Sequence, residues 1–387
     1  MKIIIVSYLP VRLYPPSLSA INNLAKIAKE VIIVTRNTTN FEWVYPENVR
    51  EVLVGDFMNI KESQQQSIFW KVSQFFKYVK VVKQTITSEK PDVVLLYDYL
   101  SAYAYYLNRS KFKKHKHIVW YHNHDVVEKN SLRRFSIGWF AEKNEQKLFK
   151  YIDLFTLPSA ERTKYFPLNN FKGKCIVVPN YPSQTIYSTR LPGKKMNDVI
   201  KMVFAGSISE GHGLEEIIDI LDKKVNGKSL ELHLLGPAGE AYINSLHSLA
   251  NAKSVTSKVI YHGWQYFKDI PELLKEYHIG LAINKPVGII YSTGGTASNK
   301  IYEYAAMGFP TLLYDNEHYR KYLQAYPWAF FTNCTPNSLL QELEKITTSY
   351  ENLSIQAHHD FIEKLNFETA FHDVSAMLVK DARKSNA

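Results

Sequence analysis

Cysteine is scarce in this chain, and long apolar runs are missing. Its 387 residues include only two cysteines, Cys175 and Cys334. Two cysteines supply neither a disulfide framework nor the closely spaced ligands of a zinc site. No apolar stretch approaches the roughly 20 residues that cross a bilayer, and the start MKIIIVSYLP lacks the cleavage site of a signal peptide. We therefore expect a cytoplasmic protein.

Acidic residues are the minority among the charged ones. The chain has 47 Lys and Arg against 37 Asp and Glu, which gives a formal net charge of +10. This excess favours an acidic partner such as a phosphorylated ligand, a nucleic acid or an anionic membrane surface. Hydrophobic residues make up 45% of the chain, which is typical of a globular protein, and its length predicts two domains.

Short apolar runs alternate with amphipathic stretches from end to end. Most of these runs are continuous, as in strands that are buried on both faces of a parallel sheet. The clearest helical pattern covers Ile68–Ile86, and the chain is helical in pattern from about Gln341 on. The expected strands are Lys2–Tyr8, Val31–Thr35, Val93–Tyr97, Ile118–Tyr121, Leu154–Leu157, Ile176–Val178, Met202–Ala205, Leu230–Leu235, Val259–Tyr261, Ile279–Ile283 and Thr311–Tyr314.

The polar, proline-containing stretch Tyr181–Asp198 interrupts this alternation and is typical of a linker. The predicted fold class is therefore α/β, with two Rossmann-like doubly wound domains that face a central cleft. The first domain is predicted at residues 1–180, the linker at 181–200 and the second domain at 201–365. Residues 366–387 are predicted to form a C-terminal helix that packs back on the first domain.

The segment GGTASNKIYEYAAMGFP, residues 294–310, has a glycine-rich start followed by a helical pattern. If a helix begins near Thr296, its first turn offers free N–H groups and a positive dipole end to an anion. Glu303 then lies in the second turn, where its carboxylate can accept hydrogen bonds from two hydroxyls of a ribose. This pattern predicts a nucleoside diphosphate site, and the alternative is a capped surface helix with a solvated Glu303. The residues expected at the site are Gly294, Gly295, Thr296, Ser298, Asn299, Lys300 and Glu303.

A second glycine-rich element, FAGSISEGHGLEEII at residues 204–218, also follows an expected strand and opens a helix. It departs from GxGxxG and so does not indicate a dinucleotide site. Gly206, Ser207 and His212 are expected near phosphate oxygens. For His212, an ordinary capping or surface role is the alternative.

Several segments occur in an order that is typical of one group of enzymes. WYHNHD, EKNEQKLFKYID and VVPN come first, followed by GSISEGHGLEEII, HLLGPAGE, YHGWQYFKDIPELLKEYHIGLAINKP and SNKIYEYAAMGFPTLL. In these segments the chain resembles the GT-B glycosyltransferases over nearly its whole length, in particular the large retaining family often called family four.

The resemblance implies transfer of a sugar from a UDP- or GDP-linked donor to a glycan or lipid-linked acceptor, in surface polysaccharide assembly. It implies no other cofactor and no metal. Glu303 would hold the donor ribose, and residues 294–296 would meet the diphosphate and the sugar. Trp264 would flank the base and Gly236 would line the same pocket. His124 would face the donor sugar and the acceptor, so His124 and Glu303 are the expected catalytic residues.

The chain departs from the family pattern at three positions of the donor site. The first glutamate of the family's pair falls at Gly295, and the usual arginine and lysine fall at Ser207 and His212. Lys300 or Lys285 could replace the missing cations. These departures leave open a catalytically inactive, transferase-like protein. Two further hypotheses for the function are a nucleotide-sugar epimerase and a two-lobed sugar-binding protein.

The first half is basic and aromatic. The helix expected at 68–86 carries four lysines, and RSKFKKHKH at 109–117 is a dense basic run. For the helix we favour a core-facing element with solvated lysines. For the basic run, contact with the inner-membrane surface and a solvated loop both stay open. We expect no nucleic-acid partner, because no recognised module is present. His122, His124 and Asp125 lack a further well-spaced metal ligand.

Overall fold

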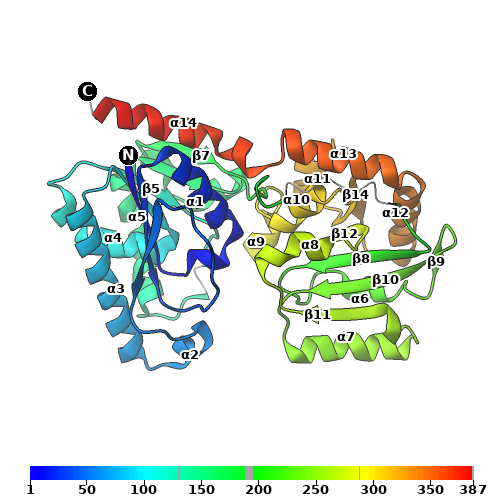
Figure 1. Ribbon diagram of the computed structural model, residues 1–387. Coiled ribbons are helices and arrows are strands. Elements are labelled where there is room, and N and C mark those ends of the chain that lie inside the picture. Colours follow the sequence, from blue (N-terminus) through cyan, green and yellow to red (C-terminus); the bar gives the residue numbers. More distant parts are fainter. Residues whose placement is uncertain (129–130, 188–194, 287, 386–387) are drawn as a thin grey trace. The chain divides into compact units, whose positions relative to one another are not determined.

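The computed structural model describes residues 1–128, 131–187, 195–286 and 288–385. The chain divides into two compact units (Figure 1). Unit 1 comprises Met1–Pro179 and the chain from Ala370 on, and unit 2 comprises Asn180–Thr369. Of the stretch that we expected to be a linker, residues 188–194 lie outside the described residues. Tyr187 belongs to unit 2, and its side chain is fully buried there.

Unit 1 is built on a sheet whose described strands are all parallel, in the order β3-β2-β1-β4-β5-β6-β7. The strands are β1 (Lys2–Ser7), β2 (Glu30–Arg36), β3 (Val49–Val54), β4 (Val93–Tyr97), β5 (Ile118–His122), β6 (Leu154–Leu157) and β7 (Lys174–Val177). The helices are α1 (Pro15–Ile27), α2 (Ile60–Gln65), α3 (Ile68–Glu89), α4 (Asp98–Phe112), α5 (Ile137–Leu148) and the chain's last helix, α14 (Phe367–Ser385), with 3₁₀ turns at Val11–Leu13, Phe149–Tyr151, Ala160–Tyr165 and Leu168–Asn170.

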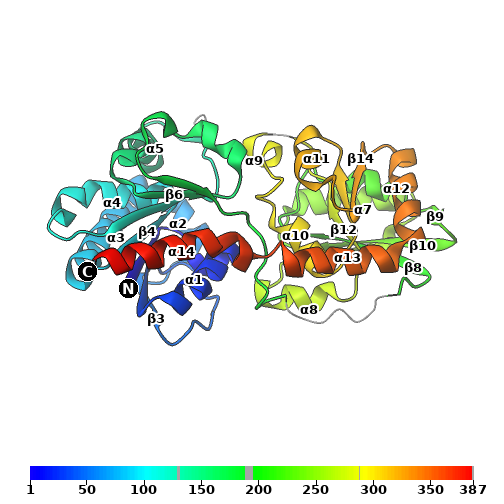
Figure 2. The same ribbon diagram turned by 90° about the horizontal axis from the view of Figure 1, so that it is seen from above.

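Helices cover both faces of this sheet. Neighbouring side chains of β5 show the two faces, because successive residues of a strand point to opposite sides. The Tyr121 hydroxyl donates to Glu145 of α5, whereas the Trp120 ring packs 5.9 Å from Phe371 of α14. α5 and α14 therefore lie on opposite faces, and α1 is on the same side as α14 in Figure 2.

Unit 2 has the same architecture, with strand order β11-β10-β8-β12-β13-β14 and a short antiparallel β9 beside β10. Its strands are β8 (Val199–Ala205), β9 (Lys224–Val225), β10 (Lys228–Leu235), β11 (Val259–Gly263), β12 (Ile279–Ala282), β13 (Thr311–Tyr314) and β14 (Ala329–Thr332). Its helices are α6 (Leu214–Ile218), α7 (Glu240–Ala252), α8 (Ile270–Leu274), α9 (Gly288–Ser292), α10 (Asn299–Ala306), α11 (Glu317–Leu323), α12 (Pro336–Thr348) and α13 (Tyr350–Glu363), with 3₁₀ turns at Thr256–Lys258 and Phe267–Asp269.

Two apolar clusters, one on each face, hold this second sheet. One joins the sheet to α6, α7 and α12 through residues such as Ile217, Leu246 and Leu343. The other joins it to α8, α10, α11 and α13 through residues such as Leu274, Tyr304 and Phe361. The prediction of two doubly wound α/β domains is thus confirmed, because both sheets carry helices on both faces.

Strands β3, β9 and β14 were absent from the sequence-based prediction. β3, VREVLV, carries two charged residues and lies at the edge of its sheet, where one side is open to water. β14 has four residues at the other sheet's edge, and β9 has two. Within the segment EKNEQKLFKYID, residues 142–153, the α-helix ends at Leu148, and Asp153 precedes β6.

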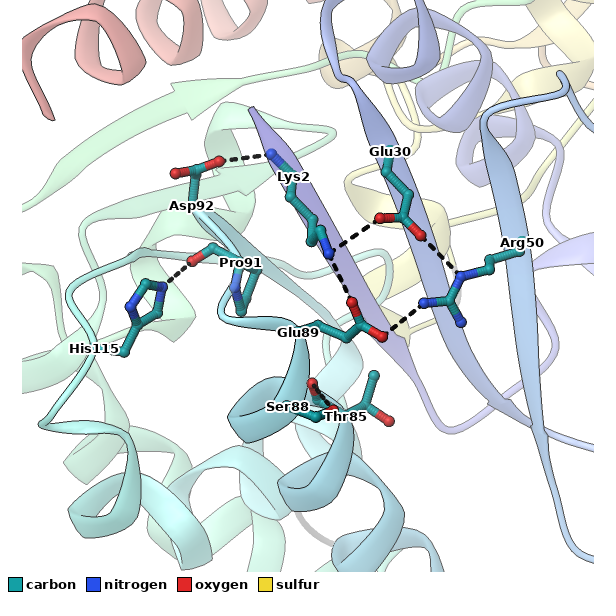
Figure 3. A network of polar contacts seen from close by, with 9 residues as sticks. All are labelled: Lys2, Glu30, Arg50, Thr85, Ser88, Glu89, Pro91, Asp92 and His115. Carbon is teal, nitrogen blue, oxygen red and sulfur yellow. Dashed lines mark hydrogen bonds and ion pairs between the residues drawn. The ribbon is translucent and has the colours of Figure 1, made fainter. Parts of the chain in front are cut away.

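An ion-pair network ties the amino ends of β1, β2 and β3 to the end of α3 (Figure 3). Lys2 contacts Glu30 and Glu89 at 3.1 and 2.7 Å, and Arg50 contacts the same two carboxylates at 2.9 and 2.8 Å. Hydrogen bonds from Arg50 and Lys2 lower the pKa of Glu30, and those from Lys2 and Arg50 lower that of Glu89. The positive charges of Lys2 and Arg50 thus balance the negative charges of Glu30 and Glu89.

Among the described residues, no helix combines the length and the apolar character needed to cross a bilayer.

Candidate functional site

Three loops of unit 2 are joined at the carboxyl edge of its sheet, where ligands of doubly wound sheets bind. They follow β8, β10 and β11 and carry the predicted residues Gly206, Gly236 and Trp264. Gly206 donates its N–H to Leu235 O at 2.8 Å, and Gly236 donates to Gly263 O at 2.8 Å. The sequence pattern had located each loop separately, and these hydrogen bonds bring them side by side.

Gly236 is required by a close approach of two backbones. Its φ is +141°, and a Cβ at this position would lie 1.9 Å from the carbonyl oxygen of Gly206. Gly206 itself has φ +142°. Neither position accepts a larger residue without displacing the loops.

Helix α10 begins three residues later than predicted. Its first residue is Asn299 and its N-cap is Ser298, rather than a start near Thr296. The preceding residues form a turn in which Ser298 N–H donates to Gly294 O at 2.8 Å. Asn180, the last residue of the VVPN segment, holds this turn by donating its amide N–H to Thr296 O and its side-chain amide to Ala297 O, both at 2.9 Å. The role of Asn180 was not predicted.

The backbone of Gly295 is already engaged within unit 2. Its N–H donates to His318 Nε2 at 2.7 Å, and its carbonyl accepts from the Tyr302 hydroxyl at 2.6 Å. A Cβ here would meet the Tyr322 and His318 rings at 2.7 and 2.8 Å. These rings fill the space that a side chain at 295 would need, so the glutamate that the resemblance implies at this position would not fit unless they moved.

Glu303 lies in the second turn of α10, as predicted, but it is not a solvated surface residue. It is 9% exposed, and burial raises the pKa of its carboxyl to about 7. The Tyr187 hydroxyl and the Lys300 amine oppose this shift. The carboxylate is thus held away from water, and it would gain from hydroxyl donors supplied by a ligand.

Lys300 extends from the first turn of α10 toward the Gly206 loop. Its Nζ lies 3.7 Å from the centre of the Phe204 ring and 3.4 Å from where a Cβ on Gly206 would stand. Burial lowers the pKa of its amine to about 7, and Glu303 acts in the opposite direction. Lys285 differs, because it forms an ion pair with Glu216 that raises its pKa. Of the two candidate replacement cations, Lys300 is the one beside the glycine loop.

His212 is buried and carries no charge at neutral pH. Burial, with a smaller effect of Lys300, lowers its pKa to about 4. Asn284 donates its amide N–H to the Tyr319 hydroxyl at 3.0 Å, so its Oδ1 faces His212 Nδ1 at 2.9 Å. An amide oxygen only accepts, so His212 Nδ1 carries the proton, and Nε2 is buried and unprotonated. The surface role considered for His212 is wrong, because its side chain is only 2% exposed.

Ser207 and Trp264 lie at the outside of this site. Ser207 is exposed. Trp264 is 52% exposed, and its ring stacks edge-on against Tyr266 at 4.4 Å. A half-exposed aromatic pair on a loop at the carboxyl edge is suited to contact a flat ligand group.

His124 belongs to unit 1 and follows β5. Its ring lies between Tyr97 and Tyr14, which stack on it at 4.9 and 5.6 Å. Its Nε2 is 2.9 Å from Ser17 Oγ, and its Nδ1 is 3.2 Å from His122 Nε2. Burial lowers its pKa to about 4, so the imidazole is neutral, and both of its ring nitrogens have partners within unit 1.

A chain of hydrogen bonds fixes the orientation of the His124 ring. His122 Nδ1 is 2.7 Å from Thr156 Oγ1, which also accepts from Trp120 Nε1 at 2.7 Å. Burial holds the pKa of His122 well below its usual value. His122 therefore supports His124 as a neutral partner. The described residues contain no group of three or more His, Cys, Asp or Glu side chains arranged to hold a metal.

Comparisons with known proteins agree with this architecture. No protein-family model and no curated protein matches the sequence. Among solved structures, the chain is similar to sucrose-phosphate synthase of Thermosynechococcus elongatus, with TM-score 0.67, 12% identity and coverage of 99% and 98% of the two chains. It is also similar to Anabaena HepE in complex with UDP and glucose, with TM-score 0.62, 15% identity and coverage of 98% and 100% of the two chains. A third similar structure is WaaG, a glycosyltransferase involved in lipopolysaccharide biosynthesis, with TM-score 0.64, 12% identity and coverage of 98% and 99%. The chain has the GT-B fold of these proteins.

The close approach at Gly236 gives a testable expectation. Gly236→Ala should lower the free energy of unfolding by about 2 kcal/mol or more, because its Cβ collides with the Gly206 carbonyl. Gly239→Ala is a matched control, since a Cβ there meets open space, and it should cost less than about 1 kcal/mol. Urea unfolding of both variants measures the difference, and equal costs would contradict the packing described here.

Proposed function

We propose that this protein is a glycosyltransferase that moves a sugar from a nucleoside diphosphate to a glycan or lipid-linked acceptor. The observation that carries the proposal is Glu303, a buried carboxylate in the second turn of α10. Lys300, one turn earlier on α10, approaches the Gly206 loop, which hydrogen bonds join to the loops after β10 and β11 at the ligand-binding edge of the sheet. A buried carboxylate without water needs hydroxyl or cationic partners, and a ribose supplies two hydroxyls. The bound forms of similar proteins, UDP with glucose in HepE, support a nucleotide-sugar donor.

The donor would lie along the carboxyl edge of unit 2. Trp264 and its loop would flank the base, which we take to be uracil or guanine, and Glu303 would hold the ribose. The diphosphate would lie at the start of α10, near Gly294, Thr296, Ser298 and Asn299, and near Gly206 and Gly236. Lys300 would supply the positive charge that Ser207 and His212 do not. His212, which is neutral and lies near Lys300, would adjoin the diphosphate.

In the reaction the bond between the anomeric carbon and the diphosphate oxygen breaks. The acceptor oxygen bonds to that carbon, and its proton passes to the leaving diphosphate. Negative charge grows on the leaving diphosphate, where the helix dipole of α10 and the Lys300 ammonium stabilise it. His124 would orient the acceptor or a donor hydroxyl. We propose retention of configuration, which the resemblance implies. No cofactor other than the nucleotide-sugar co-substrate is proposed.

Membrane contact is part of the proposal for a lipid-linked acceptor. The core side of α3 carries the buried Phe75, Tyr78 and Val82, as expected for a core-facing helix. Its outer side, however, exposes Phe69 at 88% and Phe76 at 57%. Exposed lysines Lys77, Lys80 and Lys83 follow on the same helix. Exposed aromatics beside lysines support peripheral binding to an anionic bilayer, such as the inner face of a bacterial inner membrane.

The ribose assignment predicts a specific loss of nucleotide affinity. Glu303→Ala should weaken the binding of both UDP and GDP at least about tenfold, because each nucleotide loses the same two hydroxyl contacts to a charged group. Glu303→Gln should give a smaller loss. Glu351→Ala, a change of an exposed carboxylate in the first turn of α13, serves as control. Calorimetry measures all four proteins, and unchanged affinity in Glu303→Ala would rule out the ribose contact.

The shifted pKa values of Glu303 and Lys300 on α10 predict a bell-shaped pH dependence of donor affinity. Glu303 gains a proton below about pH 7 and loses its value as an acceptor, whereas Lys300 loses its charge above about pH 7. UDP-glucose is the suitable probe, since its diphosphate does not titrate in this range. Lys300→Arg should remove the alkaline decline and keep the acid one, because arginine stays charged. The control Lys285→Arg should keep both the acid and the alkaline decline. If the alkaline decline survives in Lys300→Arg, Lys300 is not the group that contacts the diphosphate.

The α3 surface predicts binding to anionic vesicles. Phe69→Ser with Phe76→Ser should reduce co-sedimentation with phosphatidylglycerol vesicles at least about tenfold, because two aromatic side chains no longer enter the interface. Ile355→Ser removes an exposed apolar side chain of unit 2 instead and should leave binding unchanged. Vesicles of phosphatidylcholine alone should bind weakly. An equal effect of both sets of changes would argue against α3 as the docking surface.

A further inference from the structure

A large cavity lies at the amino edge of the sheet of unit 1, the edge opposite to His124. Its volume is about 1410 Å³, above the range of a few hundred to about 1,000 Å³ that is usual for small-ligand pockets. The amino ends of the consecutive strands β1, β4, β5, β6 and β7 contribute to its wall, and α14 closes one side. Both views show the N-terminus beside α14 (Figures 1 and 2).

Five lysines from separate parts of the chain line this cavity. They are Lys116 before β5, Lys150 in the turn before β6, Lys172 and Lys174 at the start of β7, and Lys380 on α14. Within the described residues, none of the five side chains forms an ion pair or a hydrogen bond. The neighbouring Lys2 is different, because Glu30 and Glu89 balance it (Figure 3).

The carboxylates of the cavity do not neutralise these lysines. Asp92 accepts a hydrogen bond from the backbone N–H of Lys2 at 2.6 Å (Figure 3), and Asp153 accepts one from Val119 N–H at 2.8 Å. Both carboxylates therefore serve to hold strand ends together. The third, Asp373, is exposed and lies 3.5 Å from His372. The lining thus carries five cationic lysines against three carboxylates, which leaves an excess of positive charge.

Hydrogen bonds hold the loop that carries Lys116 in place. His115 Nε2 donates to Pro91 O at 2.9 Å (Figure 3), since a carbonyl only accepts. His117 Nδ1 donates to His115 O at 3.0 Å, which leaves His117 Nε2 to accept from the Tyr105 hydroxyl at 2.8 Å. The two histidines thus tie the loop before β5 to neighbouring segments, and Lys116 is held at the rim between them.

We propose that this cavity binds an anion that carries two or more phosphate groups. Lysine ammonium groups are compact point charges with three donors each, which suits the tetrahedral oxygens of phosphates. Five of them around one hollow exceed what a single phosphate could contact. The site is separate from the proposed donor site, because it lies in unit 1 and at the amino rather than the carboxyl edge of its sheet.

The test is a calorimetric titration of the full-length protein with inorganic tripolyphosphate. UDP is kept saturating so that the donor site of unit 2 is filled. We expect saturable binding, weakened at least tenfold when Lys150→Ala and Lys174→Ala are combined. The matched control combines Lys26→Ala and Lys61→Ala, two exposed lysines of unit 1 outside the cavity, and should change affinity less than twofold. If UDP does not bind to unit 2, the comparison still tests the cavity. The cavity and control variants have the same unit 2, so a difference in their tripolyphosphate affinity arises in unit 1.

A second arm uses vesicles that contain phosphatidic acid, with the Phe69→Ser and Phe76→Ser changes present to remove the α3 contribution. Binding that is confined to vesicles, and lost only in the cavity variant, would assign the phosphates to lipid headgroups. Equal losses in the cavity and control variants, or no saturable binding to either probe, would overturn the proposal. So would stronger binding of a single-stranded oligonucleotide of matched charge, which would indicate a nucleic acid instead.

Discussion

The burial of two opposite charges in the first turns of one short helix is the constraint on which the rest of unit 2 depends. Lys300 and Glu303 are one turn apart on α10, and burial shifts the pKa of each to about 7. Removing charges from water is costly unless partners replace the water. Lys300 approaches the Gly206 loop and Glu303 interacts with the buried Tyr187, and a ligand at this edge of the sheet would supply further partners for both charges.

The chain departs in three places from the pattern of the family that it resembles. A neutral His212 and an exposed Ser207 replace two cations, but Lys300 brings a cation to the same glycine loop from a different element. At position 295, His318 and Tyr322 occupy the space of the missing glutamate. The site is therefore rearranged rather than emptied.

Much of the fold was predictable, because continuous apolar runs such as Val93–Tyr97 have few alternatives to a buried parallel strand. Edge strands such as β3 were not, since their alternation is broken by charges. The position of Glu303 in the second turn followed from helical spacing. The contribution of Asn180, His318 and Tyr187 could not be predicted, because they come from segments far apart in sequence. The lysine-lined cavity of unit 1 likewise gathers residues from 116 to 380.

A crystal of the protein soaked with UDP tests the central claim most directly. The account predicts density for the nucleotide at the carboxyl edge of unit 2, with the ribose hydroxyls on the Glu303 carboxylate and the diphosphate between the start of α10, Lys300 and the Gly206 loop. Nucleotide bound elsewhere, or an unoccupied edge at saturating UDP and GDP, would contradict it.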